Sequence, residues 1–301
     1  MKELREIPVE EFDSLFPKRH SVYDSSGFNL LNGAKVERLK AFALFDERGK
    51  PVVGQILGLR DGLWRAPFSA PFSVASVNGE NGSLVDEFYG RLSDSLEAPL
   101  RLVWSPEAYG VALPSLPGAE LITDANFHYP MERFTEGRFE QYLSRSGRYN
   151  HHRAMKHDFE FGETHDIERA YSLIRKNREA MGYPLAMSLA QVCETVKLVP
   201  AHFFIMTLGG EDIASAMIYD AAPGIAQVIY WGDLPQGRPF RAMNHLAYKV
   251  FEWYDCNRKD ITIIDIGPAS SDGVRNEGLC QFKMSIGCVE TKKVTILINK
   301  N

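Results

Sequence analysis

The sequence predicts an α/β (α+β) fold built from two similar units in tandem, each a mixed, curved sheet flanked by helices. Three observations support this. The chain has 301 residues, more than one hydrophobic core usually serves, so two domains of about 150 residues are expected. Hydrophobic residues make up 45% and charged residues 24%, as in ordinary folded proteins. The order of predicted elements in the first half recurs in the second, at an offset of roughly 160 residues.

The first half opens with a predicted hairpin, because two apolar runs flank a turn-forming segment rich in Asp, Gly and Pro. Apolar residues at a spacing of three and four then predict a helix with one buried face. The predicted elements are, in order, the strands 40–45, 52–59 and 63–68, the helix 83–96, and the strands 100–104 and 121–131.

The second half repeats this order after a segment of different character. Residues 138–199 run from apolar to basic and then show helical periodicity over 167–181 and 189–198, with Ser188 as an N-cap. The elements that follow are the strands 202–208, 213–219 and 225–231, the helix 241–254, and the strands 261–266 and 288–298. We therefore predict an N-terminal domain 1–136 and a C-terminal domain 137–301 with a helical insertion 138–199.

Charge, hydropathy and cysteine spacing exclude several classes of protein. The net charge of -5 argues against broad non-specific binding to nucleic acid, although a local basic patch stays open. No apolar run reaches the roughly 18 to 20 residues of a membrane span, and the first residues lack a signal-peptide core, so we expect a cytoplasmic protein. The four cysteines, 193, 256, 280 and 288, lack zinc-like spacing and are expected to be small buried residues; no metal is expected.

Three stretches of the second half resemble a known family. They are Tyr142 to Lys156, a basic segment; Arg241 to Tyr254, leading to Ile264-Asp-Ile-Gly267; and Asn276 to Gly287, which contains a Gly-Leu and a Phe-Lys pair. Together with the element order, they resemble the GNAT acyltransferase superfamily and, within it, the tandem-domain Fem-type peptidoglycan-bridge aminoacyltransferases. The resemblance covers the whole chain in architecture and about residues 140–290 in sequence.

The resemblance implies an acyltransferase. The expected reaction moves an acyl group from acyl-coenzyme A, used as co-substrate, to an amine on a small-molecule or nucleotide-linked acceptor. One alternative is Fem-like transfer from aminoacyl-transfer RNA to a cell-wall precursor; another is a catalytically silent binding protein that keeps the fold. The segment before the predicted helix at 241 has glycine only at position 237, and Pro239 lacks an N–H, unlike the glycine-rich loop that holds coenzyme A pyrophosphate in GNAT enzymes.

Candidate catalytic residues are Asp265, at the end of a β-branched run, and Lys283, in the Phe-Lys pair. A carboxylate there is suited to act as a base or to orient an amine, and an ammonium to bind a phosphate or carboxylate. The alternative interpretations, without a catalytic role, are a turn cap for Asp265 and a solvated surface position for Lys283. Acyl transfer to an amine needs no covalent nucleophile, which agrees with a sequence lacking a nucleophile elbow.

Residues near the donor are expected where GNAT-like sheets part, beside Tyr230 and Trp231, and around the start of the following helix, at Arg238, Arg241 and Asn244. Packing is the alternative role for the two aromatic residues. Candidate substrate-binding residues are Arg148, His152, Arg153, Lys156, Arg175, Asn177, Tyr183, Asn276 and Phe282. The basic run is suited to phosphates, including those of transfer RNA, but such runs are more often solvated faces.

Overall fold

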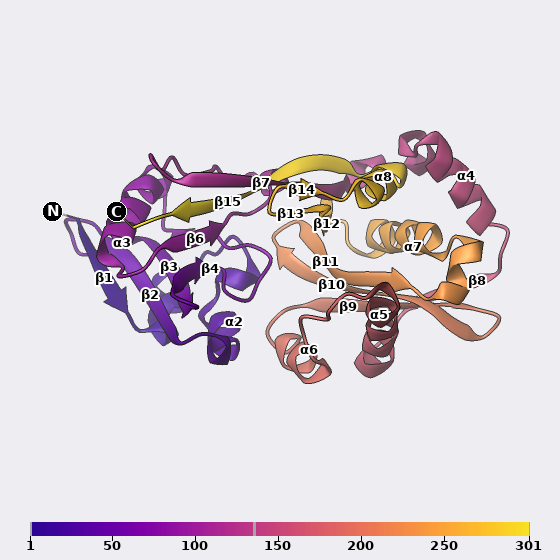
Figure 1. Cartoon of the computed structure of the whole chain (residues 1–301), viewed down its shortest axis with the longest axis horizontal. Helices are drawn as coiled ribbons and strands as arrows, with labels where there is room; N and C mark the ends of the chain where they lie inside the picture. Colours follow the sequence, from indigo (N-terminus) through magenta and orange to yellow (C-terminus); the bar gives the residue numbers. More distant parts are fainter. Residues whose placement is uncertain (1, 135–136, 301) are drawn as a thin grey trace. The chain divides into compact units, whose positions relative to one another are not determined.

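The structure is a computed structural model that describes residues 2–134 and 137–300. Its strands are β1 (Glu3–Ile7), β2 (Arg38–Phe45), β3 (Pro51–Arg60), β4 (Leu63–Ala66), β5 (Ser76–Val77), β6 (Leu100–Val103), β7 (Glu120–Pro130), β8 (Phe159–Glu163), β9 (Ala201–Leu208), β10 (Glu211–Ala222), β11 (Ile225–Asp233), β12 (Ile263–Pro268), β13 (Ser270–Ser271), β14 (Val274–Arg275) and β15 (Val289–Ile298). Its α-helices are α1 (Phe12–Leu15), α2 (Ser26–Leu31), α3 (Val85–Ser95), α4 (Arg145–Ala154), α5 (Ile167–Met181), α6 (Leu189–Thr195), α7 (Ala242–Asn257) and α8 (Glu277–Ser285) (Figure 1).

The chain forms two compact units. The first comprises residues 1–124, 272–274 and 292–301, and the second comprises residues 125–271 and 275–291. The last strand explains why the first unit takes in the C-terminus: Thr295 to Ile298 of β15 pair antiparallel with Leu100 to Val103 of β6. The predicted domain 137–301 includes these C-terminal residues, since a pairing so distant in sequence leaves no local pattern.

The first unit contains a sheet in the order β1-β2-β3-β4-β6-β15. Neighbouring strands are antiparallel except β4 and β6, which are parallel. Helix α3 buries Phe88, Tyr89 and Leu92 in a core with the sheet. The rings of Phe12 and Phe16 pack in a separate core, and a Cβ on Gly54 of β3 would come within 2.4 Å of Phe16. Glycine at 54 thus permits the close approach of α1 to the sheet.

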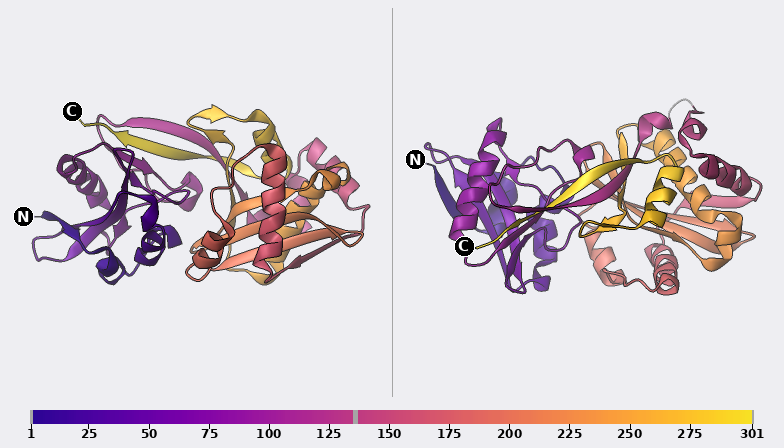
Figure 2. Two further views of the ribbon diagram at one scale, coloured as in Figure 1. Left: turned by 60° about the horizontal axis from the view of Figure 1, so that its bottom comes forward. Right: turned by 45° about the horizontal axis from the view of Figure 1, so that its top comes forward.

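The second unit repeats this arrangement in the order β7-β12-β11-β10-β9-β8. Its neighbouring strands are antiparallel except β11 and β12, which are parallel. Helix α7 packs its buried Leu246, Val250 and Phe251 into the main core of this unit. Helices α5 and α6 lie on one face of the sheet and α7 on the other (Figures 1 and 2). Hairpin, third strand, helix and parallel strand therefore recur, which confirms the predicted repeat.

The elements expected from local patterns are present, while others were missed. Helix α5 spans the residues predicted for it, and Ser188 caps α6 in a capping box with Gln191. Strands β1, β5 and β8 and helices α1, α2 and α8 were not predicted. The expectation that 138–199 is a helical insertion is wrong over β8, which pairs with β9 as the edge strand of the sheet. The expectation of four buried cysteines is wrong for Cys256, which is exposed, and Cys193 is only partly buried. Along the described part of the chain, no helix combines the length and apolarity needed to cross a membrane.

Candidate active site in the second unit

Strands β11 and β12 part within the sheet of the second unit. They pair in parallel from Ile225 with Ile263 to Gln227 with Asp265. Residues 225–268 are all described, and within them the pairing of β11 with β12 ends at Gln227 and Asp265. Strand β11 stays paired with β10 as far as Asp233. We call the region beyond Gln227 and Asp265 the second parting. A strand edge without a strand neighbour is where an extended ligand adds backbone hydrogen bonds.

Asp265 is buried at the last paired position, with 0% of its surface exposed. Its carboxylate accepts hydrogen bonds from Asn126 Nδ2 at 2.9 Å and Gln227 Nε2 at 2.7 Å. It also accepts from the backbone N–H of Gly267 at 3.0 Å. These bonds connect β7, β11 and β12 at the point where the second parting begins. A carboxylate so enclosed fixes the strand ends; it does not present itself to solvent as a base.

His128 faces Asp265 from the neighbouring strand, since the two residues are directly paired between β7 and β12. Its side chain is buried, and its Nδ1 has no hydrogen-bond partner among the described residues. Burial lowers the pKa of His128, and the nearby Asp265 carboxylate opposes that shift without cancelling it. The imidazole is therefore neutral at neutral pH.

Lys283 on α8 holds the end of β12. Its Nζ donates to the carbonyl oxygens of Ile266, Gly267 and Pro268 at 2.9, 2.8 and 2.9 Å. The side chain is 3% exposed, so the solvated-surface interpretation is wrong. Burial lowers the pKa of Lys283 to about 8, while Asp265 acts to raise it. Because an ammonium has three N–H donors, these carbonyls use its full bonding capacity.

The aromatic residues Tyr230 and Trp231 lie on β11 beyond Gln227, the last residue that pairs with β12. The guanidinium of Arg178 on α5 lies 5.3 Å from the Tyr230 ring centroid and 5.7 Å from that of Tyr183. Burial raises the pKa of the Tyr230 hydroxyl. The Trp231 ring lies edge-on to Phe282, with 6.5 Å between the centroids. The second parting is thus bordered by aromatic rings from β11 and α8 and by an arginine from α5.

Solved structures show which known fold this arrangement matches. FemX superimposes with a TM-score of 0.65 at 12% identity, over 98% of this chain and 97% of that one. The C-terminal domain of a putative lysylphosphatidylglycerol synthetase from Agrobacterium fabrum gives 0.61 at 11% identity, over 97% and 92%. A tandem GNAT protein from the clavulanic acid biosynthesis pathway gives 0.53 at 10% identity, over 99% and 98%. The chain has a GNAT-like, Fem-type tandem fold. Neither a protein-family model nor a curated protein matches the sequence.

The segment before α7 differs from the glycine-rich loop of GNAT enzymes. It forms a short 3-10 helix, η9 (Pro235–Phe240), with Pro239 inside it. Arg241 follows in a left-handed conformation with φ of 63° and occupies the N-cap of α7, and Asn244 is buried in the first turn. The Arg241 Nε is buried without a partner among the described residues. A guanidinium beside a helix N-terminus is suited to an anion.

Arg238 and Asn177 lie beside the end of β11. The Nδ2 of Asn177 donates to the carbonyl of Asp233 at 2.6 Å, and a Cβ on Gly232 would lie 2.4 Å from the Asn177 side chain. Arg238 Nε lies 3.7 Å from the Asp233 carboxylate. Burial raises the pKa of Asp233, against the effect of Arg238. Both predicted residues therefore contact the end of β11.

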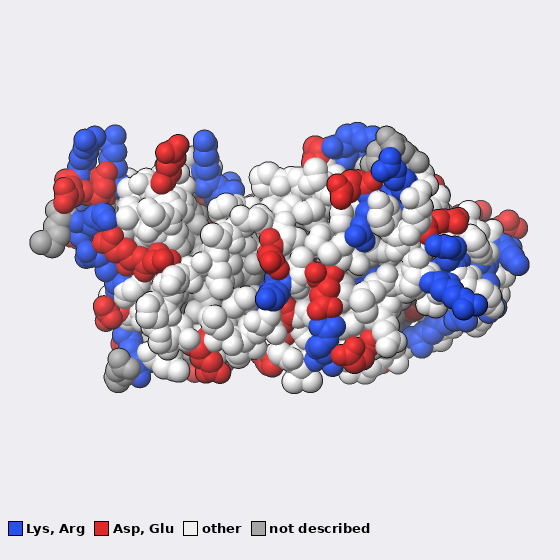
Figure 3. All heavy atoms as spheres, turned by 90° about the horizontal axis from the view of Figure 1, so that it is seen from above, with Lys and Arg blue, Asp and Glu red and all other residues white. Residues whose placement is uncertain are grey.

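The predicted residues of the basic segment lie on α4 or directly after it. The contacts described for them are with Glu140 and Tyr149, not with residues of β11. Arg148 and His152 both contact Glu140, the histidine at 3.0 Å, and Arg153 lies over the Tyr149 ring at 5.9 Å. Lys156 is exposed just after the helix. Residues 141–157 contain four Arg or Lys and no acidic residue. Figure 3 shows Lys and Arg side chains gathered at the end of the second unit that carries α4.

Two other predicted residues have local roles. Asn276 caps α8, where its side chain accepts from the Leu279 N–H at 3.0 Å. Arg175 is exposed on α5 and lies 3.8 Å from Glu179 one turn later. Residues that the sequence analysis missed are Asn126, His128 and Gln227. All three are polar residues within predicted strands, a signal that was present in the sequence and was not used.

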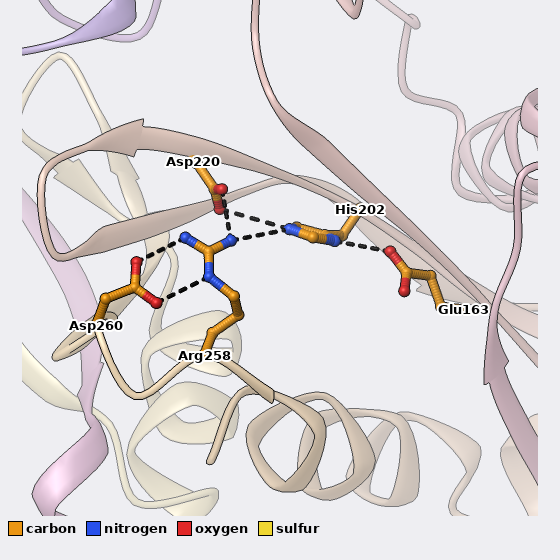
Figure 4. Close-up of polar contacts among 5 residues, drawn as sticks. All are labelled: Glu163, His202, Asp220, Arg258 and Asp260. Atoms are coloured by element: carbon orange, nitrogen blue, oxygen red, sulfur yellow. Dashed lines mark hydrogen bonds and ion pairs between the residues drawn. The ribbon is translucent and has the colours of Figure 1, made fainter. Parts of the chain in front are cut away.

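A second polar cluster lies at the opposite end of α7. Arg258 after the helix donates to Asp220 at 2.6 Å and to both oxygens of Asp260, and His202 Nδ1 lies 2.7 Å from Glu163 (Figure 4). Burial opposes a charge on His202, but hydrogen bonds to Asp220 and Glu163 outweigh it and raise its pKa.

Arg258 and His128 both line a cavity of about 610 Å³. No group of three or more His, Cys, Asp or Glu side chains suited to a metal occurs in the described ranges.

Proposed function

We propose that this chain is an acyltransferase that moves an acyl group from acyl-coenzyme A to an amine acceptor. The observation that carries the proposal is the second parting, where β11 continues to Asp233 after its pairing with β12 ends at Gln227 and Asp265. In GNAT-like folds the donor enters between the strands at this place. Two structural neighbours support transfer chemistry: one is the C-terminal domain of a putative lysylphosphatidylglycerol synthetase, and the other is a tandem GNAT protein whose structure was solved without acetyl-coenzyme A.

In this proposal the protein acts chiefly by positioning. An amine attacks the donor carbonyl and a tetrahedral intermediate forms. The carbon–sulfur bond then breaks, and the leaving thiolate of coenzyme A takes up the proton that the amine loses. Holding the reactants in register supplies several kcal/mol of the barrier reduction. We assign Asp265 and Lys283 the role of fixing the end of β12. Both side chains are buried, and both form hydrogen bonds with the backbone there. Asp265 also accepts a hydrogen bond from Gln227 of β11. Tyr230 and Trp231 line the donor, and Arg238 and Arg241 hold its phosphates.

Transfer from aminoacyl-transfer RNA is the second candidate. Two observations favour it. The 3-10 helix η9 with Pro239 replaces a glycine-rich phosphate loop. Helix α4 and the residues directly after it carry a basic exposed surface at Arg148, His152 and Lys156. Basic residues grouped on one helix attract the phosphates of RNA. FemX and the lysylphosphatidylglycerol synthetase domain share this fold.

Ligand-induced stabilisation tests the proposal. Acetyl-coenzyme A at 100 times its Kd should stabilise the native state by about 2.7 kcal/mol, raising the melting temperature. Trp231→Ala should reduce this ligand-induced shift, whereas Tyr149→Ala, an exposed aromatic on α4, should leave it unchanged. Transfer of a labelled amino acid from charged transfer RNA, with no shift by any coenzyme A ester, would establish the second candidate. Neither binding nor transfer would leave a silent binding protein.

A further inference from the structure

The first unit contains the counterpart of the second parting. Its parallel strands β4 and β6 pair from Trp64 with Leu100 to Ala66 with Leu102. Strand β4 then ends, but β3 continues its pairing with β5, where Gly54 pairs with Ser76. Strands β4 and β5 together thus take the place that β11 takes in the second unit. Residues 67–75 interrupt that strand, and we call the region beyond Ala66 and Leu102 the first parting.

The interrupting segment occupies the first parting. The N–H of Ser73 donates to the carbonyl of Val103, the last residue of β6, at 3.0 Å. Phe72, Ser73 and Val74 are 1%, 4% and 1% exposed. The Phe72 ring meets Tyr109 edge-on at 4.7 Å. Residues 72–74 therefore lie beside the end of β6. At the matching place in the second unit, the edge of β11 beyond Gln227 has no strand neighbour among the described residues.

A chain of buried hydrogen bonds fixes this segment. Asp24, at the end of the 3-10 helix η2 (Val22–Asp24), accepts from the Ser73 hydroxyl at 2.7 Å and the Val74 N–H at 3.1 Å. Gln55 of β3 donates to the Ser73 hydroxyl at 2.8 Å, and the Tyr89 hydroxyl of α3 donates to Gln55 at 2.8 Å. Sheet and helix of the first unit thus both hold residues 72–74 through donors and acceptors that match.

We propose that residues 72–74 are a built-in occupant of the first parting, locked by Asp24, so that the chain has one donor site and not two. The occupant supplies the backbone hydrogen bond to β6 and the buried side chains that an extended ligand would otherwise supply. The statement about donor number rests on the proposed function, whereas the statement about the occupant does not.

Amide hydrogen exchange tests the occupant directly. In the wild-type protein, peptides covering residues 70–78 should exchange at least 100-fold more slowly than exposed turns such as residues 46–50. Asp24→Asn should accelerate exchange in these peptides at least tenfold, because a neutral amide replaces the carboxylate that accepts from Ser73 and Val74. Asp46→Ala is the matched control: Asp46 also accepts two backbone N–H bonds, from Arg48 and Lys50, but in an exposed hairpin turn.

Fast exchange of residues 70–78 in the wild-type protein would overturn the proposal.

Native mass spectrometry with acetyl-coenzyme A tests the number of donor sites. It should count one bound molecule per chain, in wild type and in Asp46→Ala alike. Two bound molecules in wild type would also overturn it. No bound molecule, together with slow exchange at 70–78, would refute acyl-coenzyme A as the donor while upholding the occupant.

Discussion

Lys283 shows how burial changes the meaning of a residue. If Lys283 were solvated, the alternative interpretation of the sequence, its replacement would change the melting temperature little. Since Nζ bonds three carbonyls at 3% exposure, we now predict that Lys283→Met destabilises the protein by about 1–3 kcal/mol, through carbonyls left without a donor. Urea unfolding measures this. Lys259→Met, at an exposed position, should change stability by less than about 0.5 kcal/mol; equal effects would contradict the assignment.

Two buried histidines make stability depend on acidity. His151 of α4 and His245 of α7 each have a buried Nδ1 without a partner among the described residues. Burial lowers the pKa of both, that of His245 to about 4. The titratable groups that act on them are Lys249, Glu252 and His151 for His245, and Glu140 and His152 for His151.

The folded state therefore disfavours their protonation. This contribution to stability is present above the unfolded pKa of about 6.5 and is lost as pH falls towards 4. We predict that the melting temperature declines over that window and that His245→Gln declines less steeply. His165→Gln, at an exposed loop position, should follow the wild-type curve. Parallel curves for all three proteins would show that His245 does not contribute.

At the scale of elements, two helical glycines differ in what surrounds them. A Cβ on Gly147 of α4 would lie 1.9 Å from the carbonyl oxygen of Ser285 in α8, whereas nothing lies within 4 Å of a Cβ on Gly90 of α3. Gly147→Ala should therefore cost about 1–3 kcal/mol by forcing α4 away from α8. Gly90→Ala should stabilise the protein by about 0.5–1 kcal/mol through helix propensity. Chemical denaturation of both variants measures these opposite signs, and destabilisation by both would contradict the close contact.

Local sequence patterns predicted the elements well because their causes are local. The periodicity of 167–181 and the Ser188 cap depend on neighbours within one or two turns. The occupant at residues 72–74 depends on Asp24 and Val103, some 50 and 30 positions away along the chain, so no window on the sequence reveals it. The same holds for Lys283, whose burial is set by the carbonyls at the end of β12.

At the scale of the molecule, the first unit completes its sheet with a strand from a distant part of the chain. Residues 295–298 of β15 pair with β6, almost 200 positions earlier. In the second unit, residues 126–130 of β7 lie within its own continuous segment 125–271 and pair there with β12. An N-terminal fragment that stops before β15 therefore lacks the partner of β6. The donor site proposed in the second unit depends on β7, because Asn126 holds Asp265 at the parting.

The pairing of β15 with β6 predicts that a change at the C-terminus destabilises the first unit. A chain ending at Val294 loses the partner of β6 and the fully buried Ile296. Removing this one side chain from a core costs about 2–5 kcal/mol. Amide exchange should accelerate in β6 and in β3 of the first unit, while β9 and β10 stay protected. A chain ending at Ile298 keeps the pairing and should exchange like wild type. Unchanged protection of β6 in the shorter chain would mean that β15 is dispensable and that each unit is stabilised by its own half of the sequence.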